Sequence, residues 1–164
     1  MQDGVDEIVA AWHRELPEVE GLPLEIGKRV AALYGALDAE TNAELAALGL
    51  TKAEYEVLAK LRAAGEPYQL RPHELASTLS LSSGGTTNVV HRLVAAELVV
   101  RQAHPDDRRG AAVRLTDKGR RTAEAAVLAT NRAQRDLLAG VAGVDGRALA
   151  DALRTVLAGL PRRR

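Results

Sequence analysis

The sequence contains no cysteine and no phenylalanine, and its 164 residues include one tryptophan and three tyrosines. The absence of cysteine excludes disulfide bonds, thiolate metal sites and any cysteine-based redox switch. Because aromatic residues are so few, the core has to consist of leucine, valine and alanine, a composition that favours helices packed on helices. No apolar run is long enough to span a membrane, and the acidic first segment, MQDGVDEIVAAWHRE, is unlike a signal peptide. We therefore expect a cytoplasmic protein with no membrane partner.

Charge of either sign is not in excess, since 22 lysines and arginines balance 22 aspartates and glutamates. This balance gives no global attraction to nucleic acid, so any basic surface has to be local. The four histidines lack the close spacing of metal ligands, and the sequence shows no nucleophile–base pair and no phosphate-binding glycine loop. We expect no catalytic residue, no metal and no cofactor. A small helical enzyme stays as an alternative, which turnover of a small substrate in the absence of DNA would support.

Apolar residues recur at steps of three and four along most of the chain, which is the spacing of amphipathic helices. Thr51 and Glu54 form a capping-box pattern at one predicted helix start, and Thr116 can cap another. Two alternating, β-branched stretches on either side of a turn-rich loop predict a β-hairpin. The predicted elements are helices over 4–16, about 24–48, 51–65, from Pro72, 83–96, 117–139 and around Leu149 to Leu160, with strands over 98–103 and 111–115.

This order predicts a mainly α fold with a small β-hairpin wing. Residues 51–116 have the element order of a winged helix–turn–helix. The helices on either side carry apolar stripes that this small segment cannot cover, and a second copy of the chain is the simplest partner for them. We expect a single domain over 1–164, in which 51–116 form a DNA-binding lobe and 1–48 and 117–160 form a dimerisation lobe.

The helix over 83–96 has a small, polar outer face. With Leu93 at the buried centre and a step of 100° per residue, Asn88 and His91 lie opposite the core, where they can hydrogen-bond to base edges. Arg92 lies at the margin, within reach of a phosphate. The alternative is that SSGGTT is merely a polar surface turn and helix start. The candidate major-groove residues are Ser83, Thr87, Asn88, His91 and Arg92.

Four charges stand side by side in HPDDRRG, at the tip of the predicted hairpin. Surface ion pairs contribute about 0–1 kcal/mol each, so stability is a poor explanation for them. A carboxylate from Asp107 can instead hold a guanidinium in one orientation, and an arginine held in this way can enter a narrow minor groove. The alternative is a tip that is simply solvated. The preceding helix–turn–helix favours the DNA-binding interpretation, because the two features together are more specific than either one.

These two stretches resemble one known family. LVVRQAHPDDRRGAAVRLTDKGRR closely resembles the wing and following helix of the MarR (multiple antibiotic resistance regulator) family, and HELASTLSLSSGGTTNVVHRLVAAELV resembles its two DNA-binding helices. In this resemblance Asp107 and Arg109 match the family's wing aspartate and arginine, with Arg108 between them. Glu97 stands where a glycine usually precedes the first wing strand, and His104 stands where an aspartate is frequent.

The resemblance implies a homodimeric winged helix–turn–helix regulator that binds double-stranded DNA. Its terminal helices would dimerise, the second helix of the motif would enter the major groove, and the wing arginine would enter the minor groove. We accordingly predict a sequence-specific transcriptional regulator, in the first instance a repressor, that acts on a palindromic operator. A winged-helix module used for protein contacts alone is the alternative.

The resemblance also implies a small-molecule effector, because such regulators often bind small anions or phenols between the dimer helices and the DNA-binding lobe. The only tryptophan, Trp12, lies on the inner stripe of the first helix, either as a core or interface residue or as a pocket wall. A urate-responsive branch of the family is similar at Trp12 and Arg101, but it has an aspartate and an arginine where this chain has Glu56 and Val89. Because the missing arginine would be a charge-assisted partner for an anion, an aromatic or carboxylic metabolite is favoured over urate. The candidate ligand residues are Trp12, His13, Tyr34, Glu56 and Arg101.

Overall fold

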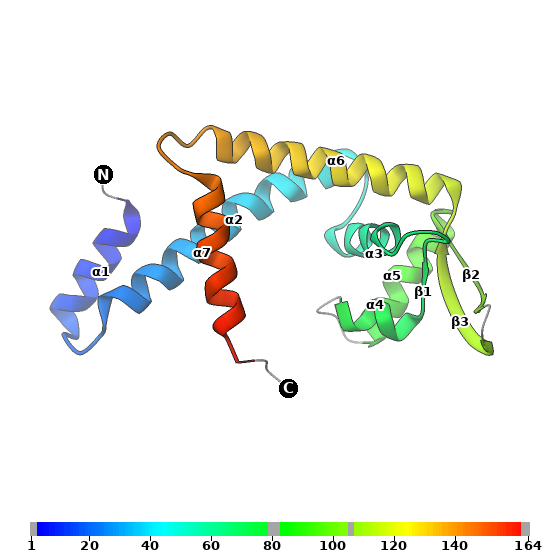
Figure 1. Cartoon of the computed structure of the whole chain (residues 1–164), viewed down its shortest axis with the longest axis horizontal. Helices are drawn as coiled ribbons and strands as arrows, with labels where there is room; N and C mark the ends of the chain where they lie inside the picture. Colours follow the sequence, from blue (N-terminus) through cyan, green and yellow to red (C-terminus); the bar gives the residue numbers. More distant parts are fainter. Residues whose placement is uncertain (1–2, 79–82, 105–106, 162–164) are drawn as a thin grey trace.

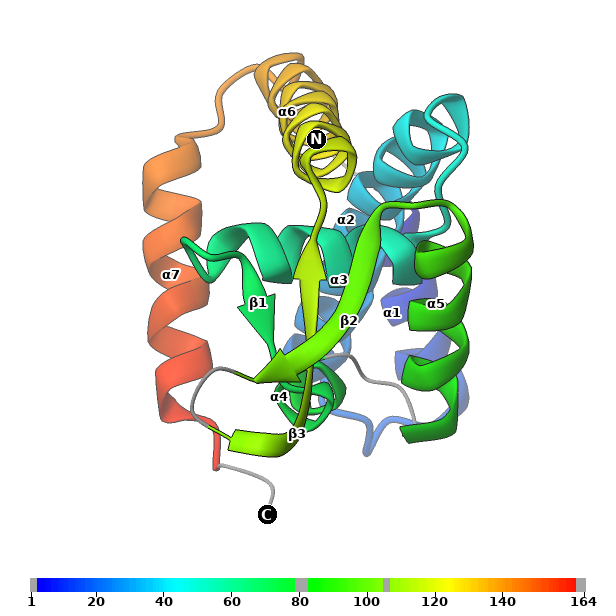
Figure 2. The ribbon, with the colours of Figure 1, turned by 90° about the vertical axis from the view of Figure 1, so that its right-hand side faces the viewer.

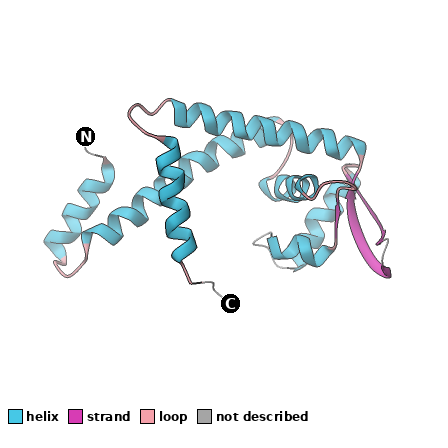
Figure 3. Cartoon of the chain, viewed as in Figure 1, coloured by secondary structure: helices cyan, strands magenta, loops and turns pink. Residues whose placement is uncertain are grey.

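The computed structural model is mainly helical, with a small three-stranded sheet near one end (Figure 1, Figure 3). It describes the backbone of residues 3–78, 83–104 and 107–161, and the side chains of residues 3–76, 85–102 and 112–161. The predicted fold class is confirmed. The elements are α1 (Gly4–Glu15), α2 (Gly21–Ala47), α3 (Lys52–Ala63), β1 (Gln69–Leu70), α4 (Pro72–Thr78), α5 (Ser83–Ala95), β2 (Val99–His104), β3 (Asp107–Leu115), α6 (Asp117–Ala139) and α7 (Gly146–Gly159).

The sheet and the shorter helices α3, α4 and α5 form a lobe at one end of the molecule, and two long helices lead away from it (Figure 1). Helix α6 packs against both α2 and α3, and α1 packs against α2. Helix α7 stands apart, and none of its residues is buried. None of the helices in the described part of the chain is both long and apolar enough to cross a membrane.

Side chains cap several helix starts, and two of these caps were predicted. Thr51 accepts a hydrogen bond from the backbone of Glu54, whose carboxylate in turn binds the Thr51 backbone, so the predicted capping box is confirmed. Thr116 accepts from the backbone N–H of Gly119 and begins α6 as predicted. Helix α2 begins three residues before its predicted start, because Pro23 falls within its first turn, where no intrahelical N–H partner is needed.

The sheet is antiparallel, and β3 lies between β1 and β2 (Figure 2). Strand β3 begins at Asp107, four residues before the predicted start, because its pairing with β2 continues past a register shift between Ala103 and His104. Strand β1 is an addition that the sequence did not predict: its two residues, Gln69 and Leu70, pair with Arg114 and Val113.

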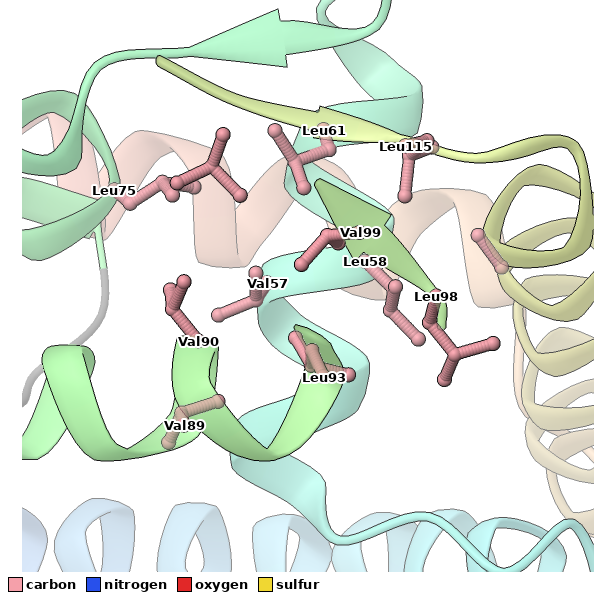
Figure 4. Close-up of a cluster of buried hydrophobic side chains, with 12 residues drawn as sticks. Val57, Leu58, Leu61, Leu75, Val89, Val90, Leu93, Leu98, Val99 and Leu115 are labelled. Carbon is pink, nitrogen blue, oxygen red and sulfur yellow. The ribbon is translucent and has the colours of Figure 1, made fainter. Parts of the chain in front are cut away.

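The core of the lobe is a cluster of aliphatic side chains from every surrounding element (Figure 4). Burial of a leucine or valine side chain stabilises the fold by about 1.5–3 kcal/mol, so this cluster is the main source of the lobe's stability. It joins α3, α4 and α5 to the sheet and to the start of α6. Its members are Val57, Leu58, Leu61, Leu75, Val89, Val90, Leu93, Leu98, Val99, Val113, Leu115 and Ala123.

A close approach between backbones joins the start of β2 to the first turn of α6. The carbonyl oxygen of Leu98 accepts hydrogen bonds from the backbone N–H and the hydroxyl of Thr116, at 3.1 and 3.2 Å. A Cβ atom on Gly119 would lie 1.8 Å from this same oxygen. Glycine is therefore required at position 119 for space, since the carbonyl oxygen is held in place by its partners.

We expect Gly119→Ala to lower the free energy of unfolding by about 3 kcal/mol, because the new methyl group cannot be accommodated without displacing the Leu98 carbonyl. Thermal and urea unfolding of the purified protein would measure the change. The control is Gly35→Ala in α2, where no atom lies within 4 Å of the added Cβ. That substitution should stabilise the protein by about 0.5–1 kcal/mol. Equal effects of the two substitutions would contradict the close-contact explanation.

Candidate nucleic-acid interface

Helix α5 has the two faces that its helical spacing predicts. Val89, Val90 and Leu93 are at most 4% exposed and belong to the core of the lobe, where α5 packs against α3, α4 and β2 (Figure 4). The opposite face is accessible and carries the predicted groove-facing side chains Thr87, Asn88, His91 and Arg92, all exposed. The predicted outer surface of the helix is thus confirmed as a surface, and its contacts with DNA stay a prediction.

The other predicted DNA contacts lie on residues whose side chains fall outside the described part of the chain. Asp107, Arg108 and Arg109 are the first three residues of β3, and Ser83 is the first residue of α5. For the wing, the described backbone shows that Asp107 pairs with His104 of β2. Asp107 therefore lies in the ladder of the wing, and the roles of the charged residues stay predictions.

Arg92 is already engaged within the chain. Its Nε donates a hydrogen bond of 2.8 Å to Oε1 of Glu54, the capping-box residue of α3. The guanidinium side chain is 54% exposed, whereas that of Glu54 is 13% exposed. Burial raises the pKa of Glu54, but the hydrogen bonds from Arg92 and Thr51 outweigh it, and the pKa lies below its ordinary value. The carboxylate is therefore ionised at neutral pH and forms a charged pair with Arg92.

The wing carries two exposed arginines, Arg101 and Arg114, that have no partner among the described residues. Arg101 is paired with Val113 in the ladder, and Arg114 is paired with Val100. Because paired residues share a face and neighbours alternate, the two arginines project from opposite faces of the wing. Arg101 is on the face toward α4 and α5, as its place in a cavity beside Val90 shows.

The turn that joins α5 to β2 contains Glu97, whose φ of 60° places it in the left-handed region. This conformation is the one that glycine adopts most readily, and a glutamate there costs about 1–2 kcal/mol. Neighbouring contacts hold the turn: the Thr116 hydroxyl donates to the Glu97 carbonyl at 2.7 Å, and Lys118 donates to the Ala96 carbonyl at 2.9 Å. The turn therefore has the left-handed geometry that glycine favours, although it carries glutamate.

A cavity of about 300 Å³ lies between α4, α5 and the wing. Its wall combines apolar side chains with hydroxyl groups and one guanidinium, that of Arg101. Such a mixture, an apolar wall with a few polar groups, is typical of small-molecule sites. The lining residues are Pro72, His73, Ala76, Thr86, Thr87, Val90, Arg101 and Val113.

The five predicted ligand residues are spread over four elements. Trp12 and His13 lie on α1, Tyr34 on α2, Glu56 on α3 and Arg101 on β2. Trp12 and Tyr34 are 46% and 61% exposed, so neither is part of the core of a single chain. Within the part of the chain that the structure describes, no hydrogen bond, ion pair or ring contact joins any two of the five. Their predicted ligand roles stay predictions.

A second polar cluster, which the sequence did not predict, ties the start of α3 to α2. The ammonium of Lys52 donates to the Asp38 carboxylate and, at 3.0 Å, to the Tyr34 hydroxyl, and it lies 5.3 Å from the centroid of the Tyr34 ring. The hydrogen bond from Lys52 holds the pKa of Asp38 below its ordinary value. Residues 14 to 18 positions apart form this cluster, and no local motif signals it.

More than half of the chain is similar in sequence to known regulators. A family model described as MarR family matches residues 48–110. The HTH-type transcriptional regulator PecS of Dickeya dadantii is 27% identical over 115 residues, which are 70% of this chain and 69% of PecS. The multiple antibiotic resistance protein MarR of Escherichia coli is 32% identical over 96 residues, which are 58% of this chain and 65%, just under two thirds, of MarR.

A solved structure extends the likeness to nearly the whole fold. It is a cysteine-to-serine mutant of MarR from E. coli, complexed with operator DNA. The TM-score is 0.68 at 25% identity, and the alignment covers 92% of this chain and 98% of that chain. The likeness therefore includes the long helices as well as the lobe that contains α5 and the wing.

Proposed function

Because the chain belongs to the MarR family, whose members are transcriptional regulators rather than enzymes, we propose that it is a sequence-specific repressor that binds a palindromic operator as a homodimer. The observation that carries this proposal is the exposed polar face of α5 beside the wing. A winged helix–turn–helix uses such a face in the major groove. Action on chromosomal DNA would place the protein in the cytoplasm.

The contacts that we propose follow the two exposed elements. Helix α5 would lie in the major groove, and the wing would lie along the adjacent minor groove, where an arginine is drawn to the most negative potential. In the wing, Asp107 would orient Arg109, with Arg108 at a neighbouring phosphate. In the major groove, the contacts would come from Ser83, Thr87, Asn88, His91 and Arg92.

Exposed apolar side chains support a dimer built from the terminal helices. In α1, α2 and the residue after α1 these side chains are at least 39% exposed, and in α7 and the residue after it they are at least 56% exposed. Large exposed apolar side chains in such number usually mark an interaction site, and a second copy could bury them by symmetry. We therefore assign residues 1–48 and 117–160 to dimerisation and 51–116 to DNA binding. The exposed side chains are Ile8, Trp12, Leu16, Leu22, Ile26, Val30, Tyr34, Val156, Leu157 and Leu160.

Light scattering of the purified protein should give the mass of two chains. Leu157→Asp should shift the mass toward that of one chain, because it would place a charge in the buried interface. The matched control is Val94→Asp on α5, where the side chain is 40% exposed and lies outside the proposed interface. A mass of one chain for the unaltered protein would contradict the proposed dimer.

Arg109→Ala should lower the affinity for operator DNA at least tenfold, because it removes the wing arginine from the minor groove. The slope of log affinity against log salt should also fall, by about 0.9 for each phosphate that the protein no longer neutralises. Duplexes enriched by the protein from a random library would serve as operators, with binding followed by fluorescence anisotropy. The control is Arg135→Ala on α6, an exposed arginine paired with Asp136. Equal affinities of the Arg109 and Arg135 variants would refute the assignment of the wing.

For the effector, we propose an aromatic carboxylic acid bound in the cavity between α4, α5 and the wing. The guanidinium of Arg101 would pair with the carboxylate, and the apolar side chains of Val90 and Val113 would contact the ring. A ligand there would touch α5 and the wing together, so it could change how they fit the two grooves. The ligand roles of Trp12, His13, Tyr34 and Glu56 are compatible with a second pocket shared between two copies.

A panel of hydroxybenzoic and tricarboxylic acids would test this site by thermal shift in the absence of DNA. An acid that binds there should stabilise the protein by about 2.7 kcal/mol when its free concentration is 100 times its dissociation constant. Arg101→Ala should abolish most of this stabilisation. The control is Arg114→Ala, which removes the arginine on the opposite face of the wing. Stabilisation of the Arg101 variant equal to that of the unaltered protein would rule out this site.

A further inference from the structure

Glu54 binds two different elements with its two carboxylate oxygens. Oε2 accepts hydrogen bonds from the backbone N–H and the hydroxyl of Thr51, at 2.9 and 2.8 Å, and so closes the first turn of α3. Oε1 accepts from Nε of Arg92 at 2.8 Å, on the exposed face of α5. The capping residue of one helix is therefore also the anchor of an arginine on the helix that we assign to the major groove.

The geometry of this contact leaves the outer part of the guanidinium accessible. Arginine has five N–H donors, of which Nε carries one, and within the described residues the terminal amino groups of Arg92 donate to no other group. The Arg92 side chain is 54% exposed, whereas Glu54 lies largely beneath it at 13%. The carboxylate thus fixes the orientation of the guanidinium from below, while its terminal N–H groups face the solvent.

We propose that Glu54 is a positioning residue for DNA recognition, which holds Arg92 so that its terminal amino groups meet a phosphate beside the groove entered by α5. This inference rests on the proposed function. A long side chain loses conformational freedom when it binds, and an arginine already held at Nε loses less. Charge-assisted hydrogen bonds from the terminal amino groups to phosphate would then form without rearrangement of the helix.

The first turn of α3, which carries Glu54, is attached to α2. Two positions before Glu54, Lys52 binds Asp38 and Tyr34 of α2, so the first turn of α3 is attached to the long helix. Two cations therefore contact this capped turn. Lys52 joins it to α2, and Arg92 joins it to α5. This attachment makes the turn a firm base from which to orient Arg92.

The opposite role, in which Glu54 withholds Arg92 from DNA, is less consistent with the contact. A withheld arginine would have its terminal amino groups engaged as well, and within the described residues those of Arg92 donate to no other group. Here the bond is at Nε. In addition, both oxygens of Glu54 already accept hydrogen bonds. These bonds offset part of the negative charge of the carboxylate and so weaken its repulsion of a nearby phosphate.

The test is a double-mutant cycle with Glu54→Ala and Arg92→Ala, measured on a duplex that the unaltered protein enriches from a random library. Arg92→Ala should lower the affinity about tenfold and reduce the salt slope by about 0.9. Glu54→Ala should give a smaller reduction of both, and the double variant should bind as Arg92→Ala does, since Glu54 acts through Arg92.

Two further variants separate positioning from helix capping. Glu54→Gln has one acceptor oxygen in place of two, so it can accept from Arg92 only by giving up the bond from the Thr51 backbone. It should keep part of the affinity while the melting temperature falls. Thr51→Ala should lower the melting temperature by weakening the cap, yet leave the salt slope unchanged, because it does not touch Arg92. Circular dichroism at the assay temperature would establish that each variant is folded.

Three results would overturn the proposal and leave the proposed function standing. Tighter binding by Glu54→Ala would mean that the carboxylate withholds the arginine. Additive effects in the double variant, or a decrease of the salt slope in Thr51→Ala equal to that in Glu54→Ala, would mean that Glu54 does not act through Arg92. Failure of the unaltered protein to enrich any duplex would overturn the proposed function as well.

Discussion

The backbone carbonyl of Leu98 ties the segment between α5 and the wing to the start of the long helix α6. It follows the turn after α5, directly precedes β2, and accepts two hydrogen bonds from the residue that caps α6. The absence of a side chain at Gly119 allows the approach. Because Leu98 lies between α5 and β2 and its carbonyl oxygen is bonded to the residue that caps α6, the three elements meet at this residue. The candidate interface is therefore held by backbone contacts as well as by the core.

The helices could be predicted from the sequence because local patterns determine them. Apolar spacing set their faces, and Thr51 and Thr116 marked two starts correctly. The strands were harder, because pairing with distant residues decides where they begin. Gln69 and Leu70 are too few to show an alternating pattern, and they form a strand because Val113 and Arg114 lie beside them. The segment after Pro105 has the composition of a turn, yet from Asp107 it pairs with β2.

In the candidate interface too, local features could be predicted from the sequence and long-range contacts could not. The outer face of α5 follows from a rotation of 100° per residue, so Asn88 and His91 could be placed on it from the sequence. Partners that are far apart in the chain could not be predicted. Arg92 and Glu54 are 38 residues apart, and a capping-box pattern says nothing about a second role for its glutamate. The cavity beside Arg101 likewise arises from four elements that no sequence pattern brings together.

Helix α6 connects the wing to the terminal helices over a long distance. Its 23 residues make a rod about 35 Å long, with the wing attached rigidly at one end and the terminal helices near the other (Figure 1). A displacement of about 2 Å at the far end would turn such a rod by only about 3°. Small shifts of the terminal helices would therefore change the orientation of the wing very little. A second connection runs through the first turn of α3, where Lys52 binds α2 and Glu54 binds Arg92 of α5. The long helix α2 is therefore joined to α5 by side-chain contacts that do not involve α6.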